Sequence, residues 1–394
     1  MRNRAGNLRG TCGEPCEEFA GNRAGNECGT VREMKGGGRL LFLLSAAHLL
    51  VDGLCAATVF GRLNGAENLS ALILLYNTLA FSTQCAAGLA ADRLRRHVQA
   101  GSVSMLAVVS GWLLPLPPLA RIVLIGLGNS VFHVAGGCVT LEQSGGRAGK
   151  LGVFVAPGAV GLTLGTLFPR LGVLFAALLV LCAVLLPVRF AGSIAEVRLS
   201  GPQAREQVFR GHVSERKGHT LVSVLLAAAV AVRAVGGSAV SFPWKTGAGL
   251  SLLLTLCVFG GKAAGGFVCD RIGVRRAALA SILPASLLTA FCSGWMVPSL
   301  AGQFALNLTM PVTLWLMYRA MPDAPGFAFG LAASALWPGT LAGRMIEPTG
   351  PARWILVLAC FLGGLWAILY AEKQIDPEAE SRGDDAKAKA PVSG

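Results

Sequence analysis

Long apolar segments follow one another along almost the whole chain, separated by short polar stretches. Each is about 20 residues long, the length at which a helix spans a bilayer. Transmembrane barrels would show alternating ten-residue segments instead, and only a helix pairs every backbone group within a continuous apolar segment. The pattern therefore predicts an all-α membrane protein with about twelve transmembrane helices, near residues 40–60, 69–90, 98–117, 119–140, 151–169, 171–190, 220–242, 247–268, 277–294, 296–318, 326–345 and 353–371.

The polar stretches divide the chain into five regions. Residues 1–38 are rich in Gly, Asn and Arg and lack periodicity, which predicts a disordered cytoplasmic tail or a mis-assigned start. Met34 would serve as an ordinary start, so we expect residues 1–33 to be dispensable. The remaining regions are an N-terminal six-helix half, a cytoplasmic connector, a C-terminal six-helix half and a disordered cytoplasmic tail, at residues 39–190, 191–219, 220–371 and 372–394.

Composition and charge support this interpretation. Hydrophobic residues make up 53% of the chain and charged residues 14%, against roughly 25% charged in soluble domains. The net charge of +13 does not indicate a nucleic-acid partner, because the basic residues flank apolar segments as they do next to a lipid bilayer. Of the 34 Lys and Arg residues, 26 fall in segments on one side and six on the other. By the positive-inside rule, both termini are cytoplasmic, in a multi-pass protein of the plasma (inner) membrane.

The two halves repeat a short motif. Gly88 precedes Asp92-Arg93 by four residues after the second apolar segment, and Gly266 precedes Asp270-Arg271 in the same way after the eighth. The offset between Gly88 and Gly266 is 178 residues. Parallel six-helix repeats of this kind are a known plan of membrane transporters.

These paired loops resemble the signature of the major facilitator superfamily. The resemblance implies two parallel six-helix repeats and transport by alternating access. An Asp near a helix end can pair with Arg and hydrogen-bond a neighbouring helix terminus, so we expect a conformational latch; the alternative is a plain positive-inside loop. The first copy carries Arg95 where the family usually has Gly. The latch residues would be Gly88, Asp92, Arg93, Gly266, Asp270 and Arg271.

A narrower resemblance is to the fosmidomycin-resistance-type branch. It rests on His48-Leu-Leu-Val-Asp52, on residues 126–133 ending in His133, on Arg147-Ala-Gly149, and on Arg233 with Phe242-Pro243. The sequence departs from the branch directly after His133, where Val134 and Ala135 replace a Pro and an acidic residue. The resemblance implies an antiporter that exports small molecules such as drugs.

Polar side chains form stripes on several predicted helices. Residues four apart share a helix face. Three such pairs occur, namely His48 with Asp52, Asn129 with His133, and Gln303 with Asn307. A charge at the bilayer centre costs about 2.5–3.5 kcal/mol, so it must face protein or water. We therefore predict a substrate and proton pathway lined by His48, Asp52, Asn129, His133, Arg233, Gln303 and Asn307. For Gln303 and Asn307, hydrogen bonding between helices is an equally good interpretation, and Lys262 can snorkel to the membrane surface.

Other features have structural interpretations. Cysteines within apolar segments, including Cys138, behave as small hydrophobic residues. Cys12, Cys16 and Cys28 lack the ligand count of a structural zinc site. The spacing Gly161-x-x-x-Gly165 favours close helix packing.

The sequence lacks the motifs of nucleotide-driven pumps and of common hydrolases. The segment Gly145–Lys150 is one residue short of a phosphate loop, and Leu151 replaces its Ser or Thr. We therefore expect no enzyme activity, no cofactor and no metal, and a secondary active transporter for a small organic solute driven by protons or another coupling ion. The alternative is a receptor or assembly factor that keeps the fold without transport. A third option is a membrane enzyme with His48, Asp52 and His133 as metal ligands.

Overall fold

The computed structural model describes the backbone of residues 18–199 and 217–376, and the side chains of residues 37–190 and 220–376. The chain separates into two compact units, Met1–Arg39 and Leu40–Gly394. Helix α1 (Glu18–Ala57) begins in the first unit, upstream of the apolar segment expected at 40–60, since no proline interrupts this stretch. The predictions for the outermost residues of both tails and for most of the connector lie outside the described residues and stay predictions.

Every regular element in the described part of the chain is a helix, which confirms the predicted all-α class. The N-terminal half contains α1 with η1 (Thr58–Arg62), α2 (Leu69–Asn77), η2 (Thr78–Ser82), α3 (Gln84–Leu94), α4 (His97–Leu113), α5 (Pro118–Glu142), α6 (Gly149–Val155), α7 (Pro157–Leu167), η3 (Pro169–Leu171) and α8 (Gly172–Leu199). The C-terminal half contains α10 (Lys217–Ser238), α11 (Gly247–Ile272), α12 (Val274–Phe291), α13 (Met296–Ala320), α14 (Pro325–Ile346) and α15 (Gly350–Ile375).

Ten helical segments of the described chain are long and apolar enough to cross a membrane. The other two predicted spans are helical as well: α4 has 17 residues and α14 has 22. Many large apolar side chains face outward, as lipid contact requires; Phe42, Val188 and Ile355 are 75%, 72% and 68% exposed. The chain is therefore a multi-pass membrane protein with the two six-helix repeats that the sequence predicts.

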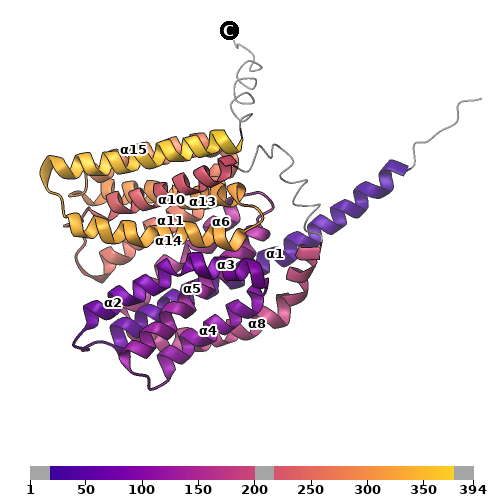
Figure 1. The fold of residues 1–394 in the computed structure, drawn as a ribbon, viewed down its shortest axis with the longest axis horizontal. Helices are drawn as coiled ribbons and strands as arrows, with labels where there is room; N and C mark the ends of the chain where they lie inside the picture. The colour runs from indigo at the N-terminus through magenta and orange to yellow at the C-terminus, as the bar shows by residue number, and fades with distance from the viewer. Residues whose placement is uncertain (1–17, 200–216, 377–394) are drawn as a thin grey trace, which may run out of the picture. The chain divides into compact units, whose positions relative to one another are not determined.

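The repeat extends well beyond the short motif. Helices α5 and α13 are both 25 residues long, and their first and last residues are related by the same offset of 178 that relates Gly88 to Gly266. Figure 1 shows α2, α3, α4, α5 and α8 grouped in one bundle and α10, α11, α13, α14 and α15 in another.

Small residues allow helices of one bundle to approach closely. A Cβ atom on Gly161 would overlap the carbonyl oxygen of Leu49, and one on Gly165 would overlap that of Gly53. Helix α7 therefore packs backbone to backbone on α1, in agreement with the close-packing interpretation of the Gly-x-x-x-Gly spacing.

The early end of α4 has a clear cause. Pro115, Pro117 and Pro118 follow Leu113 and cannot continue a helix. Arg121 compensates for the lost intrahelical bonds: its guanidinium donates to the carbonyl oxygens of Gly111 and Leu114 at 2.6 and 2.9 Å. Arg121, in the first turn of α5, thus caps the carbonyl end of α4.

Candidate functional site

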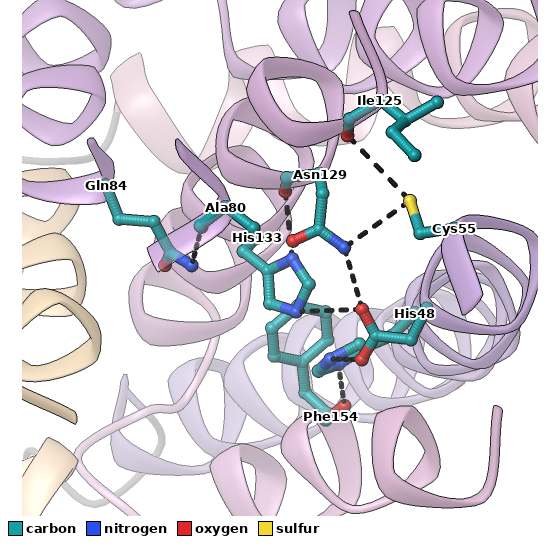
Figure 2. Close-up of polar contacts among 9 residues, drawn as sticks. His48, Cys55, Ala80, Gln84, Ile125, Asn129, His133 and Phe154 are labelled. Atoms are coloured by element: carbon teal, nitrogen blue, oxygen red, sulfur yellow. Dashed lines mark hydrogen bonds and ion pairs between the residues drawn. The ribbon is translucent and has the colours of Figure 1, made fainter. Parts of the chain in front are cut away.

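The polar residues of α1 and α5 meet around one carboxylate. On α1, the Nε2 atom of His48 lies 3.3 Å from Oδ2 of Asp52, one turn away. On α5, the Nδ2 amide of Asn129 donates to Oδ1 of Asp52 at 2.8 Å, and Nε2 of His133 lies 3.6 Å from the same oxygen. Figure 2 shows the two imidazoles and Asn129 converging on this point. His48, Asn129 and His133 are all buried.

The second nitrogen of each imidazole is held by a backbone carbonyl. Nδ1 of His48 lies 2.8 Å from the carbonyl oxygen of Phe154, and Nδ1 of His133 lies 2.9 Å from that of Asn129. A carbonyl only accepts hydrogen bonds, so both Nδ1 atoms carry their proton. In a neutral ring, Nε2 then presents a lone pair to the Asp52 carboxylate. The cluster is satisfied only when at least one further proton lies between an imidazole and the carboxylate.

A break in the fifth span supplies the carbonyl that orients His48. Pro157 has no N–H to donate to Val153, so α6 ends at Val155 and α7 begins at Pro157. The freed carbonyl of Val153 accepts from Oγ of Ser45 at 3.2 Å, and that of Phe154 accepts from His48. The sequence predicted one continuous helix here, and the proline is the reason for the difference.

Glycine next to this proline permits the close approach. A Cβ atom on Gly158 would overlap both Nε2 of His48 and Oδ2 of Asp52. The partial Gly/Pro pattern at 157–165 thus has a local function: it lets the fifth span close over the acid–imidazole cluster.

The geometry of the cluster favours protons over a metal ion. The facing atoms of His48, Asp52 and His133 lie within 4.8 Å of one another, so the convergence required by the metal-enzyme option is present. However, the Asn129 amide donates to Oδ1 of Asp52, and a donor group on that oxygen competes with a cation for its lone pairs. The His48–Asp52 separation of 3.3 Å lies at the edge of hydrogen-bond range, and the His133–Asp52 separation of 3.6 Å lies beyond it, so both are ion-pair contacts.

The Asp-Arg loops lie against helix termini of the opposite half. The Asp92 carboxylate accepts from the backbone N–H groups of Gly326 and Phe327 at the start of α14, at 2.8 and 2.7 Å. The Asp270 carboxylate accepts from Ala148 and Gly149 at the start of α6, at 2.7 and 2.9 Å. A carboxylate at a helix N-terminus is favoured by the helix dipole and by the unpaired first-turn amides.

The glycines of both motifs allow this contact. A Cβ atom on Gly88 would overlap the carbonyl oxygen of Gly326, and one on Gly266 would overlap that of Ala148. Arg93 and Arg271 are exposed. Backbone amides of the other half are thus partners of both carboxylates.

Solved structures of transporters share this arrangement of helices. A crystal structure of the E. coli fucose:proton symporter FucP matches 84% of this chain and 98% of its own, with a TM-score of 0.58 at 11% identity. Another structure of FucP, described as a major facilitator superfamily transporter in the outward conformation, matches the same shares with a TM-score of 0.54 at 12% identity. The chain has the major facilitator fold. No known protein family and no curated protein sequence matches it in a sequence comparison.

In the C-terminal half of this major facilitator fold, Arg233 forms its hydrogen bonds within its own bundle. Arg233 on α10 donates to the carbonyl of Ala229 at 3.1 Å and to the hydroxyls of Thr309 and Thr313 on α13, the latter at 2.8 Å. Its stem packs against Gly364 of α15. In the described side chains, all of these partners belong to the C-terminal bundle, and the structure does not bring Arg233 to Asp52.

Gln303 and Asn307 also remain within the C-terminal half. The Nδ2 amide of Asn307 donates to the backbone carbonyl of Gln303 at 2.8 Å. The Nε2 amide of Gln303 is buried and has no hydrogen-bond partner among the described residues. The structure therefore gathers four of the seven predicted pathway residues into one cluster and leaves three apart from it.

Lys262 is the basic residue that sequence reasoning undervalued. It is half-buried on α11, and its charge interacts with Asp52 and His133 of the other half. Snorkelling to the membrane surface stays a prediction for its side chain. Its counterpart under the 178-residue offset is Gln84, which is buried and is drawn in the same close-up as His133 in Figure 2.

Proposed function

We propose that this protein is a proton-coupled secondary transporter of a small organic solute, with Asp52, His48 and His133 as its proton site. The observation that carries the proposal is the pair of backbone-fixed imidazoles whose Nε2 atoms both face one carboxylate. Such a cluster must hold a proton to be stable, and a second proton can be added without any change of fold. Groups that load and release protons in a transporter interior are a recognised basis of coupling.

The likeness to a fucose:proton symporter supports the class of function. It is a likeness of fold, and FucP is a fucose:proton symporter. Together with a buried proton site in the N-terminal half, it favours transport over a receptor or assembly role, which has no need of such a site.

Helix α6 offers a mechanical link between the proton site and the latch. Its last carbonyls are bound by Ser45 and His48, and its first amide, that of Gly149, is bound by Asp270 of the other half. Loss of the shared proton turns the His48–Asp52 contact from attraction to repulsion between a lone pair and a carboxylate. Movement of His48 would displace the end of α6, and a seven-residue helix transmits that displacement to the Asp270 contact as a rigid element.

We also propose the latch role for the two Asp-Arg loops. Asp92 binds the start of α14, and Asp270 binds the start of α6. The helix ends that we assign to the inside are therefore tied together across the halves. Release of both contacts would open the inside, and rocking of one half against the other would alternate access to a substrate held between them.

Finer assignments rest on the sequence. The resemblance to the fosmidomycin-resistance-type branch suggests drug efflux by antiport, and we adopt export of a small organic molecule as the working direction. The uneven distribution of 26 and six basic residues supports the plasma (inner) membrane with both termini cytoplasmic.

The experiment uses purified protein in proteoliposomes that contain a pH-sensitive dye. A panel of drugs, sugars and organic acids is screened for solute-dependent proton flux, and the responding solute is then followed by gradient-driven transport and by counterflow. Asp52→Asn should abolish proton flux and concentrative transport but keep counterflow. Glu67→Gln, which removes an exposed carboxyl group between η1 and α2, is the matched control and should retain all three. Full driven transport by Asp52→Asn would refute the proton site, and no flux with any solute would count against transport itself.

A further inference from the structure

A second cluster of ligand-type side chains lies where α4 begins and α5 ends. His97 is the first residue of α4, and Cys138 and Glu142 are one turn apart at the end of α5. The Nε2 atom of His97 lies 3.1 Å from Sγ of Cys138. The ligand atoms of all three residues lie within 4.8 Å of one another. None of these residues belongs to the proton site or to the latch contacts.

The spacing suits a tetrahedral cation. Zn²⁺ lies about 2.0–2.1 Å from imidazole nitrogen and about 2.3 Å from thiolate sulfur, so two such ligands in a tetrahedral site are roughly 3.5 Å apart. The observed separation of 3.1 Å requires an adjustment of only a few tenths of an ångström. His97 and Cys138 are buried, whereas Glu142 is half-buried and leaves an opening to solvent. The cluster thus combines two sheltered ligands with one accessible ligand.

The other half shows that the fold itself does not require these side chains. The residues 178 positions further on are Arg275, Leu316 and Ala320. They occupy the same places on α12 and α13, since Arg275 is the second residue of α12 and Ala320 ends α13 as Glu142 ends α5. One set of positions therefore carries nitrogen, sulfur and oxygen ligands, and its structural equivalent carries none.

We propose that His97, Cys138 and Glu142 form a binding site for a zinc-class divalent cation in the N-terminal half. Imidazole, thiolate and carboxylate are the ligands that Zn²⁺ takes in proteins, and three of them leave the fourth position for water or another ligand. Binding releases the thiol proton of Cys138 to solvent, because the thiolate is the ligand, and uses the neutral Nε2 of His97.

The position of the site gives such an ion a structural effect. His97 follows the turn after Asp92, and Glu142 precedes the segment that leads to Ala148 and Gly149. An ion held by all three side chains would join the chain segments that carry the two latch contacts of the N-terminal half. This effect does not depend on the identity of the transported solute.

The test uses the purified full-length protein and Co²⁺ as a spectroscopic substitute for Zn²⁺. Bound metal is counted by equilibrium dialysis, and a thiolate ligand is detected by its charge-transfer absorption in the near ultraviolet. Cys138→Ala and His97→Ala should each lose one equivalent of bound cobalt, and added Zn²⁺ should displace that equivalent from the wild type. Loss of groups that merely orient a metal ligand costs about 10–100-fold in affinity, so Glu142→Gln should weaken binding by at least tenfold.

The control is Cys182→Ala, which removes another buried thiol of the N-terminal half, on α8. It should bind cobalt like the wild type. Cys12, Cys16 and Cys28 remain in every variant, so any metal they bind cancels in the comparison. Should a core variant fail to fold, Glu142→Gln on the half-buried residue still reports on the site. Equal cobalt content and equal spectra in the wild type, Cys138→Ala and Glu142→Gln would overturn the proposal, while leaving proton-coupled transport untouched.

Discussion

In the N-terminal half, α1 and α5 surround Asp52 with two imidazoles and an amide, whereas in the C-terminal half α10 and α13 enclose Arg233 with two threonine hydroxyls. The contacts that join the halves, in contrast, are nearly the same on both sides. Each motif presents a glycine for close approach and an aspartate for two backbone amides.

On the proposed alternating-access mechanism, this difference separates two requirements. Contacts between the halves would form and break in both copies of the repeat, and both copies supply the groups for them: glycine, a carboxylate and a helix terminus. The proposed ion coupling would need a titratable cluster only once. Such a cluster is expensive to bury, and among the described residues an acid–imidazole cluster occurs in the N-terminal half alone.

The fifth and eleventh membrane spans also differ between the two halves. Pro157 splits the fifth span into α6 and α7, and the freed carbonyls bind Ser45 and His48. Helix α14 also contains a proline, Pro338, yet it continues as one helix from Pro325 to Ile346. A proline therefore interrupts the span only in the half where its freed carbonyls orient a titratable side chain.

The largest predicted effect distinguishes the polar cluster around Asp52 in the N-terminal half from the one around Arg233 in the C-terminal half. His48→Gln and His133→Gln each remove a titratable ring and should lower the ratio of proton-driven transport to counterflow. Coupling free energies are typically about 1–3 kcal/mol, or roughly 5–150-fold, and the loss should fall in this range. Arg233→Lys, tested as folded protein, should keep the wild-type ratio and pH dependence. An equal loss of coupling in Arg233→Lys would show that the C-terminal half contributes to the proton site.

The next effect tests the symmetry of the latches. Asp92→Asn and Asp270→Asn each remove the charge and replace one of the two accepting oxygens with an amide NH2, which cannot accept from a backbone N–H. The N–H group left without its acceptor costs about 1–3 kcal/mol, or roughly 5–150-fold in an equilibrium. Both variants should raise cysteine labelling from the inside by similar factors, and the double variant by their product. Labelling that differs strongly between the two single variants would show that one latch dominates.

A smaller effect is expected from Pro157→Ala. The new N–H can donate to Val153, closing the break and competing with Ser45. One hydrogen bond is worth about 0.5–1.5 kcal/mol, so coupling should fall roughly twofold to tenfold while expression stays normal. Pro338→Ala in the unbroken α14 is the matched control, and its coupling should be unchanged. Equal coupling in Pro157→Ala and Pro338→Ala, measured side by side, would show that the break has no role in coupling.

The smallest effects concern the turns after the two motifs. Arg95 has φ 52° and ψ 31°, a left-handed conformation that non-glycine residues can adopt, whereas Gly273 has φ 82° and ψ 163°, which is essentially restricted to glycine. Gly273→Ala should lower the thermal unfolding midpoint, at a cost of about 1–3 kcal/mol. Arg95→Gly should change the midpoint less, since it relieves about 1 kcal/mol of strain but also removes the contacts of the Arg95 side chain. A larger loss from Arg95→Gly would mean that those contacts outweigh the strain.

These two turns also explain a departure noted in the sequence. Arg95 stands where the resembling family usually has glycine, and the N-terminal turn tolerates it because its ψ angle stays in the left-handed helical region. The sequence separates the two turns by their residues, Arg95 in one and Gly273 in the other. The backbone angles of the folded chain give the reason.

Local sequence patterns determined the helices of this protein, its division into two halves and the helix face on which a residue lies. The length of the apolar segments predicted the helices because a bilayer fixes how many residues must be apolar. The 178-residue offset predicted two equivalent halves, and the spacing of His48 and Asp52 placed both on one face of a helix because the helical period is fixed.

The tertiary structure decided which polar groups meet. Only the packing of α5 on α1 brings His133 and Asn129 to Asp52, and only the break at Pro157 gives His48 its carbonyl partner. In the same way, Lys262 faces the opposite half and Cys138, assigned as a small hydrophobic residue, lies beside His97. Sequence periodicity fixes the face of a helix on which a residue lies, but the rotation and register of each helix against its neighbours depend on the summed packing of many side chains, which no local pattern contains.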